Sequence, residues 1–382
     1  MGAVMSGILQ WAMGLISAVV LWKIRKRNIG LVIFTASLGA LGVLAVGDYS
    51  FEAKEVGGYA ALLKFSTSGG LPDTLLAIAV YTVISSTLVG LYLVLHGYVR
   101  DNRDADSRRV PVVELRGLVD TSDSPLINAV PARIIGRRED LLFDLRSMLQ
   151  PESLNVAGAL DELAHLPRSL RRVRGDSQRG SVQVIAGGVL QVPLLFATGV
   201  LLDDEGQVLL MDWERVKGKW CELDEVDSGQ RFIIEGLESE SFGDEVVLAI
   251  SASYKAELSD ISKSFPGLQL VHMARPDPKV NKIWSEDEQV ALTTQFIDTL
   301  CRLKNSDVKL IHLVLAAPAS LAIRFGRHYD LRNMPLLRCY HWQKNENPAY
   351  AWGVEMPINA KTPGTYFKHS VMTAEEPAQE HI

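Results

Sequence analysis

Residues Ile311 to Met356 carry the clearest structural pattern in the sequence and read IHLVLAAPASLAIRFGRHYDLRNMPLLRCYHWQKNENPAYAWGVEM. It opens on an apolar run, crosses the small-residue turn Ala316 to Ser320, and continues in a helix-like segment to Tyr329. Two further apolar segments follow, at 336 to 342 and 351 to 354. Strand, turn, helix and strand in this order form the repeating unit of a parallel sheet covered by helices. The stretch therefore predicts an α/β fold.

The same alternation extends upstream from Ser181. Short β-branched runs predict strands at Val182 to Ala186, Val208 to Trp213, Glu245 to Ser251, Gln269 to Met273, Val308 to Leu315, Leu336 to Trp342 and Ala351 to Val354. Helical patterns between them predict helices near Val192 to Leu202, Ala256 to Ser264, Glu286 to Leu303 and Ser320 to Tyr329.

An internal similarity at an offset of 127 residues links the two ends of this region. Gly199 corresponds to Gly326, and Trp213 corresponds to Tyr340, each at the end of the strand that follows the helix. Two such copies predict a pair of Rossmann-like halves. Chance likeness between α/β segments is the alternative.

The first 99 residues differ from the rest in composition. Residues 5 to 22, 29 to 47 and 74 to 95 form runs of 18, 19 and 22 residues without a formal charge. About 20 apolar residues cross the hydrocarbon core of a bilayer, so we predict three transmembrane helices in a membrane module at 1 to 99. Thr82, Ser86 and Gly90 place small residues at a spacing of four in the third run, which fits either an oligomer interface or packing within one chain.

The charged flanks set the predicted orientation. Cationic residues crowd positions 23 to 27 and 100 to 109, whereas residues 48 to 73 hold only Lys54 and Lys64. The positive-inside rule therefore places the N-terminus outside and the large C-terminal domain in the cytoplasm.

Between the membrane module and the strand-rich region, residues 100 to 150 are predicted to form a linker and a coupling helix. Residues 100 to 109 are charged enough for a solvated connector, and leucines at spacings of three and four predict a helix from Arg138 to Gln150. A second short helix is predicted near Val156 to Leu166. The sensing domain is then expected at 151 to 356, and a polar tail at 357 to 382.

Net charge excludes one class of partner. The chain carries a net charge of −6, and residues 1 to 99 hold six Lys or Arg and four Asp or Glu, so residues 100 to 382 carry −8. An acidic domain lacks the field that attracts DNA or long RNA. The three cysteines, Cys221, Cys301 and Cys339, lie too far apart to predict a zinc site or a disulfide framework, so no metal and no cofactor are expected.

Ligands of open α/β sheets bind outside the carboxyl ends of the strands, where helix N-termini point N–H groups at anions. Aromatic side chains at these ends suit base stacking, and nearby cations suit phosphates. The candidate ligand-binding residues are Trp213, Arg215, Trp220, Ser251, Ser253, Tyr254, Arg275, Ala317, Pro318, Ser320, Tyr340, Trp342 and Lys344. A single Trp or Tyr at the end of a strand is more often a core or edge-capping residue than a ligand contact, and His312 is expected to be a core histidine.

The stretch from Ile311 to Met356 resembles the C-terminal half of the SAVED domain, through its strand, Ala-Pro turn, Gly326-bearing helix and strand ending at Tyr340. Behind membrane helices, the chain is similar to the TM-SAVED effectors of bacterial CBASS anti-phage systems. That resemblance implies two fused CARF-like halves and a cyclic di- or trinucleotide ligand made by a cGAS-like nucleotidyltransferase. It also implies self-assembly and disruption of the inner membrane.

Two features depart from the family pattern. Such effectors are usually described with two spans rather than three, and the first half carries Gly187-Gly188 where the second carries an Ala-Pro turn. The two half-sites are therefore not equivalent.

Two other classes of function remain open. No nucleotide-hydrolase, metalloprotease or serine-hydrolase motif occurs in the sequence, so no catalytic residue is predicted, although cleavage of a nucleotide needs no such motif. A membrane scaffold without a ligand is the second alternative.

Overall fold

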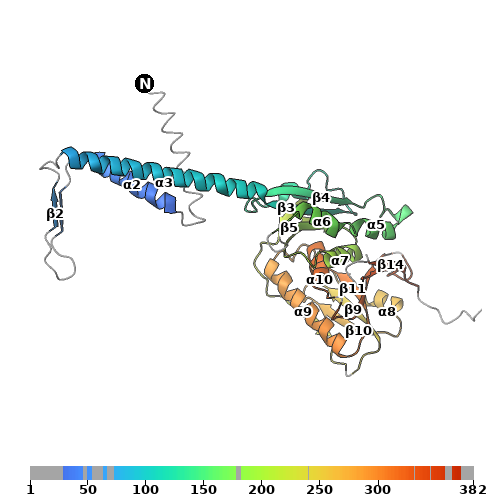
Figure 1. Ribbon diagram of the computed structural model, residues 1–382. Helices are drawn as coiled ribbons and strands as arrows, with labels where there is room; N and C mark the ends of the chain where they lie inside the picture. The colour runs from blue at the N-terminus through green and yellow to red at the C-terminus, as the bar shows by residue number, and fades with distance from the viewer. Residues whose placement is uncertain are drawn as a thin grey trace, which may run out of the picture. The chain divides into compact units, whose positions relative to one another are not determined.

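In the computed structural model (Figure 1), the described residues are 29–45, 50–53, 63–66, 73–177, 182–239, 241–330, 332–344, 346–357 and 364–370. Contacts between residues divide the chain into two units, Met1–Asp106 and Ser107–Ile382. Each unit is described by itself.

The first unit holds two helices and a hairpin. Helix α2 (Ile29–Ala45) is followed by the antiparallel strands β1 (Ser50–Ala53) and β2 (Leu63–Ser66) and by the 35-residue helix α3 (Asp73–Ser107). In α3, residues 77 to 100 are long and apolar enough to cross a membrane, whereas the apolar part of α2 is shorter. The predicted first span, 5 to 22, lies outside the described residues.

Helices α2 and α3 pack closely at Gly90. A Cβ atom at this position would lie 2.6 Å from the backbone nitrogen of Phe34, so only glycine permits the approach. Of the two readings of the small residues in this helix, Gly90 therefore fits packing within one chain.

The second unit contains two mainly parallel sheets. The first has the strand order β4-β3-β5-β6-β7, in which only the β6–β7 pair is antiparallel. Its strands are β3 (Arg109–Arg116), β4 (Arg137–Asp144), β5 (Gln183–Val189), β6 (Gln207–Glu214) and β7 (Lys219–Glu222).

The second sheet has the order β14-β13-β12-β11-β9-β10-β8. Its strands are β8 (Ile233–Glu235), β9 (Glu245–Ser251), β10 (Gln269–Ala274), β11 (Leu310–Ala316), β12 (Leu336–His341), β13 (Trp352–Glu355) and β14 (Thr365–Lys368). The helices of this unit are α4 (Leu126–Ala129), the 3₁₀ turn η1 (Pro151–Ser153), α5 (Val156–Leu163), α6 (Leu166–Arg174), α7 (Val192–Leu201), α8 (Leu258–Ser264), α9 (Glu286–Asn305) and α10 (Ala319–Arg327). The strands and helices predicted after Ser181 are thus confirmed, with boundaries that differ by a few residues.

The two sheets share one connectivity. The order β4-β3-β5-β6-β7 is matched by β10-β9-β11-β12-β13, with the same parallel pairs and the same antiparallel last pair. Strand β5 begins at residue 183 and β11 at 310, and α7 begins at 192 and α10 at 319, so the offset of 127 residues holds for both elements.

The largest core lies between the sheets. It combines their inner faces with apolar side chains of α5, α6, α7, α9 and α10. Within it, α7 and α10 cross at Gly199 and Gly326, where a Cβ on Gly326 would overlap the carbonyl oxygen of Phe196. The glycines of the internal repeat therefore allow the two helices to pack closely at this crossing.

The predicted coupling helix from Arg138 to Gln150 is wrong. Residues 137 to 144 form β4, which pairs in parallel with β3. Leu141 and Phe143 turn inward while Leu142 and Asp144 are exposed, so burial alternates with a period of two, as in a strand. The leucines in this segment also fit the spacing of a helix, which explains the wrong prediction. Backbone pairing with β3 decides for the strand.

The predicted linker boundaries change as well. Residues 101 to 107 continue α3 instead of forming a solvated connector, and β3 begins after Arg108. Because β3 pairs with β5, the first sheet starts at Arg109, and the α/β region begins earlier than the predicted residue 151. The short helix predicted at Val156 to Leu166 is present as α5 and continues into α6.

Candidate ligand-binding site

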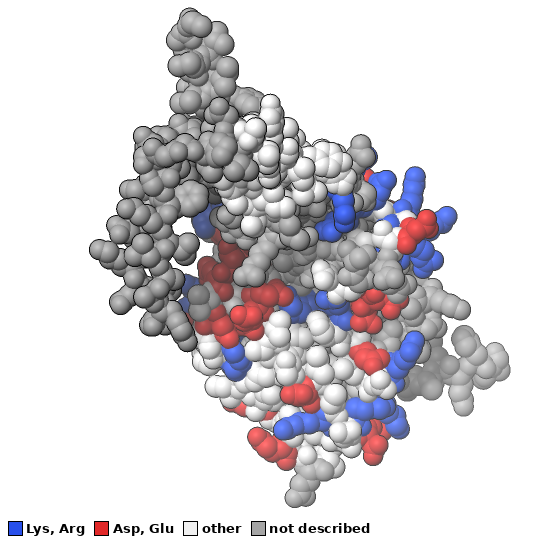
Figure 2. All heavy atoms as spheres, turned by 60° about the vertical axis from the view of Figure 1, so that its left-hand side comes forward, with Lys and Arg blue, Asp and Glu red and all other residues white. Residues whose placement is uncertain are grey.

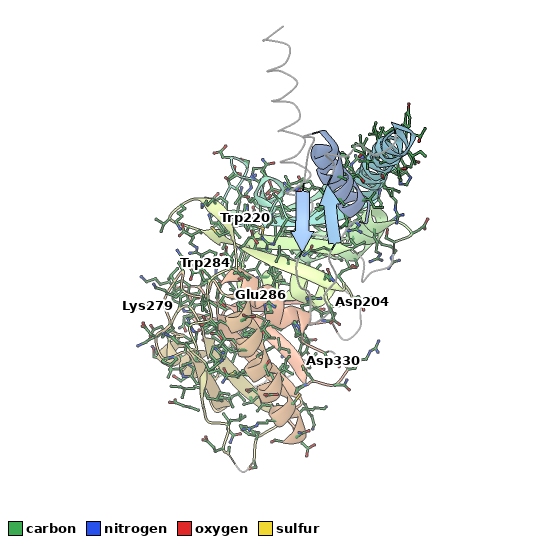
Figure 3. The ribbon with its side chains drawn as sticks, turned by 90° about the vertical axis from the view of Figure 1, so that its left-hand side faces the viewer. Asp204, Trp220, Lys279, Trp284, Glu286 and Asp330 are labelled. Atoms are coloured by element: carbon green, nitrogen blue, oxygen red, sulfur yellow. The ribbon has the colours of Figure 1, made fainter. Side chains whose placement is uncertain are left out.

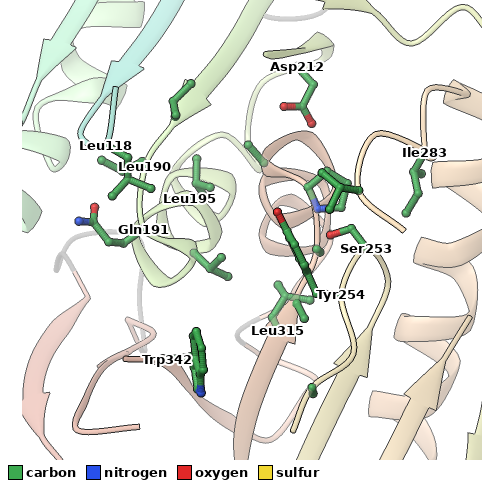
Figure 4. Close-up of a pocket in the computed structure, with 18 of the residues that line it drawn as sticks. Leu118, Leu190, Gln191, Leu195, Asp212, Ser253, Tyr254, Ile283, Leu315 and Trp342 are labelled. Atoms are coloured by element: carbon green, nitrogen blue, oxygen red, sulfur yellow. The ribbon is translucent and has the colours of Figure 1, made fainter. Parts of the chain in front are cut away.

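A cavity of about 630 Å³ opens where the carboxyl ends of both sheets meet (Figure 4). From the first sheet it is lined by the ends of β5 and β6, and from the second by the segments that follow β9, β10, β11 and β12. This volume lies in the range of small-molecule sites. The cavity, called the main cavity below, lies where open α/β sheets bind their ligands.

Two helix N-termini reach the main cavity. Gln191 and Val192 at the start of α7 line it, and so do Pro318 and Ala319 at the start of α10. The first N–H groups of a helix have no partner within the helix and favour negative charge. Both helices therefore present their first residues to the same cavity.

The two N-termini differ, because a carboxylate already occupies one of them. Asp212 at the end of β6 accepts hydrogen bonds from the backbone N–H of Ser320 (3.1 Å) and from its Oγ (2.7 Å). Burial raises the pKa of Asp212, although these hydrogen bonds oppose the shift. Asp212 thus ties the first sheet to α10, whereas the α7 N-cap residue Gln191 makes no side-chain capping bond.

Cationic side chains contribute to the wall of the main cavity. Arg215, Lys255 and Lys282 line the main cavity together with Asp212 and Glu257. On the face drawn in Figure 2, basic and acidic side chains of the molecule are interspersed. Because the net charge of the domain is acidic, a site for an anion needs cations placed locally around it. The cations at this cavity are such a local arrangement.

Ser253 adds a buried hydroxyl to this wall. It is 4% exposed, and its Oγ has no hydrogen-bond partner among the described residues. Figure 4 shows the hydroxyl turned toward the cavity, beside Tyr254. A buried hydroxyl without a partner costs free energy, which a bound acceptor or donor would recover.

Of the thirteen predicted residues, the structure brings eight together around the main cavity. They are Trp213, Arg215, Ser253, Tyr254, Ala317, Pro318, Tyr340 and Trp342. They come from both sheets, as the internal repeat implies, and include the equivalent pair Trp213 and Tyr340.

The other five do not line the cavity. Ser251 bonds His272 (3.0 Å), Ser320 holds Asp212, and Arg275 forms a buried ion pair with Glu288 (2.6 Å). Trp220 (Figure 3) is buried in β7 behind Trp213, with ring centroids 5.2 Å apart. Lys344 is exposed. These side chains lie near strand ends in the sequence, but hydrogen bonds, an ion pair or ring packing hold Ser251, Ser320, Arg275 and Trp220 in other surroundings.

Sequence reasoning missed several lining residues, which are Gln191, Asp212, Lys255, Lys282 and Trp284. Asp212 precedes the predicted residue Trp213 within the same strand, and Gln191 lies directly before the predicted helix at Val192, so both lie next to predicted features. Lys282 and Trp284 lie in the long connection between β10 and α9 (Figure 3 labels Trp284), where no periodic pattern signals direction.

Tyr340 is held from behind by a buried histidine. Its hydroxyl contacts His312 Nδ1 at 2.7 Å, and His312 Nε2 contacts Glu245 at 2.9 Å. Burial lowers the pKa of His312 and raises that of Tyr340. His312 is a core histidine, as expected, and its bond to Tyr340 fixes the orientation of a cavity aromatic.

His341 carries a pH-dependent contribution to stability. Burial lowers its pKa to about 4, so an unfolded chain, with a histidine pKa of about 6.5, binds the proton first as pH falls. We expect the free energy of unfolding to drop by about 2 kcal/mol from this residue between pH 7 and pH 5. Urea unfolding of the wild type and His341→Leu at both pH values measures the difference. An equal pH dependence in the two proteins contradicts the prediction.

No group of three or more His, Cys, Asp or Glu side chains placed to hold a metal ion occurs among the described residues.

Two regions of the chain match known protein families. Residues 166–356 match the SAVED family, described as the SMODS-associated and fused to various effectors sensor domain. The chain belongs to the SAVED family. Residues 6–159 match the SAVED-fused 2TM effector domain, whose description counts two transmembrane segments against the three predicted here. The predicted resemblance to membrane-linked SAVED effectors is confirmed.

Solved structures with a similar fold include Cap4 SAVED/CARF-domain containing receptors. That of Acinetobacter baumannii with the cyclic trinucleotide 2′3′3′-cAAA is 13% identical with a TM-score of 0.46, over 75% of this chain and 61% of that chain. That of Moraxella osloensis is 12% identical with a TM-score of 0.42, over 74% and 58%. This chain therefore spans about three fifths of the length of these receptors. No curated protein sequence matches it.

Proposed function

We propose that the SAVED domain binds a cyclic oligonucleotide in the main cavity and that binding assembles copies of the chain and disrupts the bilayer through the membrane module. The ligand comes from a cGAS-like nucleotidyltransferase during phage infection. The chain is a multi-pass protein of the bacterial inner membrane with its large domain in the cytoplasm. Cationic residues that flank the apolar runs support this orientation.

The observation that carries the proposal is the composition of the main cavity. The rings of Trp213 and Trp342 provide stacking surfaces beside Tyr340, which is 3% exposed, and Arg215 and Lys282 provide cations. Bases stack on aromatic rings, and phosphates bind cations and helix N-termini. A ligand that alternates bases with phosphates matches this wall better than a purely apolar or a purely anionic molecule.

The two sheets represent two fused CARF-like halves in this proposal. Their shared connectivity supports that origin. Their half-sites differ, because Asp212 occupies the N-terminus of α10 and because Leu190-Gln191 precede α7 where Ala317-Pro318 precede α10. A cavity with unlike halves admits a ligand without twofold symmetry.

The test is a calorimetric titration of the full chain in detergent with a panel of cyclic di- and trinucleotides, with light scattering at each step. We expect selective binding to one ligand and an increase in particle size. A folded sample that binds no member of the panel contradicts the receptor and favours a ligand-independent scaffold. Recovery of linear products after long incubation favours the nucleotide-cleaving alternative.

A pair of lysines from one connection gives a matched test of the cationic wall. Lys282 lines the main cavity, whereas Lys279 (Figure 3) lies outside it and pairs with Asp277 at 2.7 Å. We expect Lys282→Ala to weaken ligand binding about tenfold and to reduce the salt slope by about one, because one phosphate contact is lost. Lys279→Ala is expected to bind as the wild type. If both variants bound the ligand with equal affinity, Lys282 would not be a ligand contact.

A further inference from the structure

Three arginines lie on the exposed face of α6. Arg168, Arg171 and Arg172 recur at spacings of three and four, so they share one face of the helix, and all three are exposed. The leucines on the opposite face are buried in the core between the two sheets. Among the described residues, no carboxylate forms an ion pair with any of the three arginines. Asp176 follows the helix, and the segment remains positively charged with this carboxylate included.

The C-terminal end of α6 is fixed at the amino edge of the first sheet, where the parallel strands begin. Arg174, the last residue of the helix, pairs with Glu205 at 3.0 Å, and the two side chains are 8% and 7% exposed. Glu205 lies just before β6, whose first residue Gln207 is opposite Gln183 at the start of β5. Helix α6 packs along β3 and returns the chain to this edge (Figure 1). The last turn of α6, with two of the three arginines, therefore lies near the amino edge, whereas the main cavity lies at the carboxyl edge.

The starts of β3 and β4 add positive charge to the same edge. Their register places Arg109 opposite Arg137, and both guanidinium groups pair with the single carboxylate of Glu139, at 2.5 Å and 3.1 Å. Asp203 and Asp204 also lie at the amino edge, but they precede β6, which the sheet order β4-β3-β5-β6-β7 places beyond β5. The β3–β4 side of the edge is therefore positive, although the domain as a whole is acidic.

The chain keeps this edge close to any bilayer that α3 spans. The apolar stretch of α3 ends at Arg100, and β3 begins at Arg109. Residues 101–107 are helical and add about 1.5 Å each, so the connection reaches about 20 Å at most. The headgroup layer takes up the first part of this length. The start of the first sheet therefore stays near the membrane surface.

The chemistry of this face selects an anionic lipid surface. Cationic side chains within a Debye length, about 8 Å at physiological ionic strength, are attracted to anionic headgroups. Guanidinium groups also donate paired hydrogen bonds to phosphate oxygens. The apolar face of α6 is used by the core, so the contact is made by charge at the surface and not by insertion. Nucleic acid does not fit, because the acidic domain repels a long polyanion.

We propose that the SAVED domain docks on anionic phospholipid headgroups of the bilayer that the membrane module spans. The lipid-binding face consists of Arg109, Arg137, Arg168, Arg171 and Arg172. Docking turns the carboxyl edge, and with it the main cavity, away from the bilayer and toward the cytoplasm, where a ligand enters. This inference rests on the proposed location of the chain in the inner membrane and goes beyond it, because it assigns a lipid contact to the SAVED domain itself.

The experiment places the full chain in nanodiscs of phosphatidylcholine alone and in nanodiscs that also contain phosphatidylglycerol. Hydrogen–deuterium exchange of the backbone amides of α6 is measured in both. We expect this exchange to be about tenfold slower with phosphatidylglycerol, because docking opposes local opening of the helix. The triple variant Arg168→Gln, Arg171→Gln, Arg172→Gln is expected to exchange equally in both nanodiscs. The variant Arg168→Lys, Arg171→Lys, Arg172→Lys is expected to retain the difference, because it keeps the charge.

The charge-matched control is the triple variant Lys217→Gln, Lys219→Gln, Lys279→Gln. These lysines are exposed and lie in segments at the carboxyl edges of the sheets, after β6, at the start of β7 and after β10. The control is expected to keep the wild-type difference.

Equal exchange of wild-type α6 in both nanodiscs overturns the inference. So does a glutamine variant of α6 that keeps the protection, or a control that loses it. The receptor function survives these outcomes, because its ligand titration is a separate measurement and α6 does not line the main cavity. A chain that inserts into neither kind of nanodisc contradicts the membrane location and the inference together.

Discussion

Replacing Gly326 by alanine is expected to lower the free energy of unfolding of the SAVED domain by about 3 kcal/mol, the upper end of the usual cost of overpacking a core. The added methyl group would overlap the carbonyl oxygen of Phe196 in α7 and lie 3.2 Å from the Cα of Gly199. Backbone atoms of two buried helices cannot yield as the end of a flexible side chain can. The helices must separate, and the core that surrounds them must follow.

Urea unfolding of the full chain, followed by the near-ultraviolet signal of its tryptophans, measures this loss. Gly243→Ala is the control, since the nearest atom to a Cβ there lies at an ordinary contact distance of 3.9 Å. We also expect Gly326→Ala to weaken ligand binding, because separating α7 from α10 would move the first residues of both helices, which line the main cavity. A variant as stable as Gly243→Ala would mean that the crossing tolerates a wider separation.

Most strands and helices after Ser181 could be predicted because they have a clear pattern and a turn at their end, whereas the short strands β7, β8 and β14 were not predicted. The repeat of Gly199 and Gly326 was visible as well, although only the structure explains it as a contact between the two helices. Residues 109 to 150 could not be predicted in this way. In β4 the spacing of the leucines fits both a helix and a strand, and pairing with the distant strand β3 decides.

The candidate site likewise contains residues that could be predicted from the sequence and residues that could not. Its position follows from a general rule for parallel sheets, so Trp213, Tyr340 and Ala317 were found at the cavity wall. Whether a side chain faces the cavity depends on its neighbours. Ser251 bonds His272, and Ser320 bonds Asp212, so both point into networks that sequence spacing does not reveal. Hydrogen-bond partners far apart in the chain are the information that a single sequence lacks.

Arg275 gives the sharpest contrast between a predicted ligand contact and a structural role. Its guanidinium lies 2.6 Å from the carboxylate of Glu288, and both side chains are 2% exposed. We expect Arg275→Met to destabilise the domain by about 3–5 kcal/mol, because it leaves the charge of Glu288 buried without a partner. The measurement is urea unfolding of the full chain.

The double variant Arg275→Met, Glu288→Leu separates the two roles. Removing both charges eliminates the unpaired carboxylate, so most of the lost stability is expected to return, since apolar replacement of a buried ion pair is often nearly neutral. The refolded double variant is then expected to bind ligand as the wild type does, because Arg275 lies outside the main cavity. A stable double variant that no longer binds would restore Arg275 as a ligand contact and would require the segment after β10 to rearrange on binding. Stability and binding that both recover would assign Arg275 to the fold alone and leave Arg215, Lys255 and Lys282 as the cations that face the ligand.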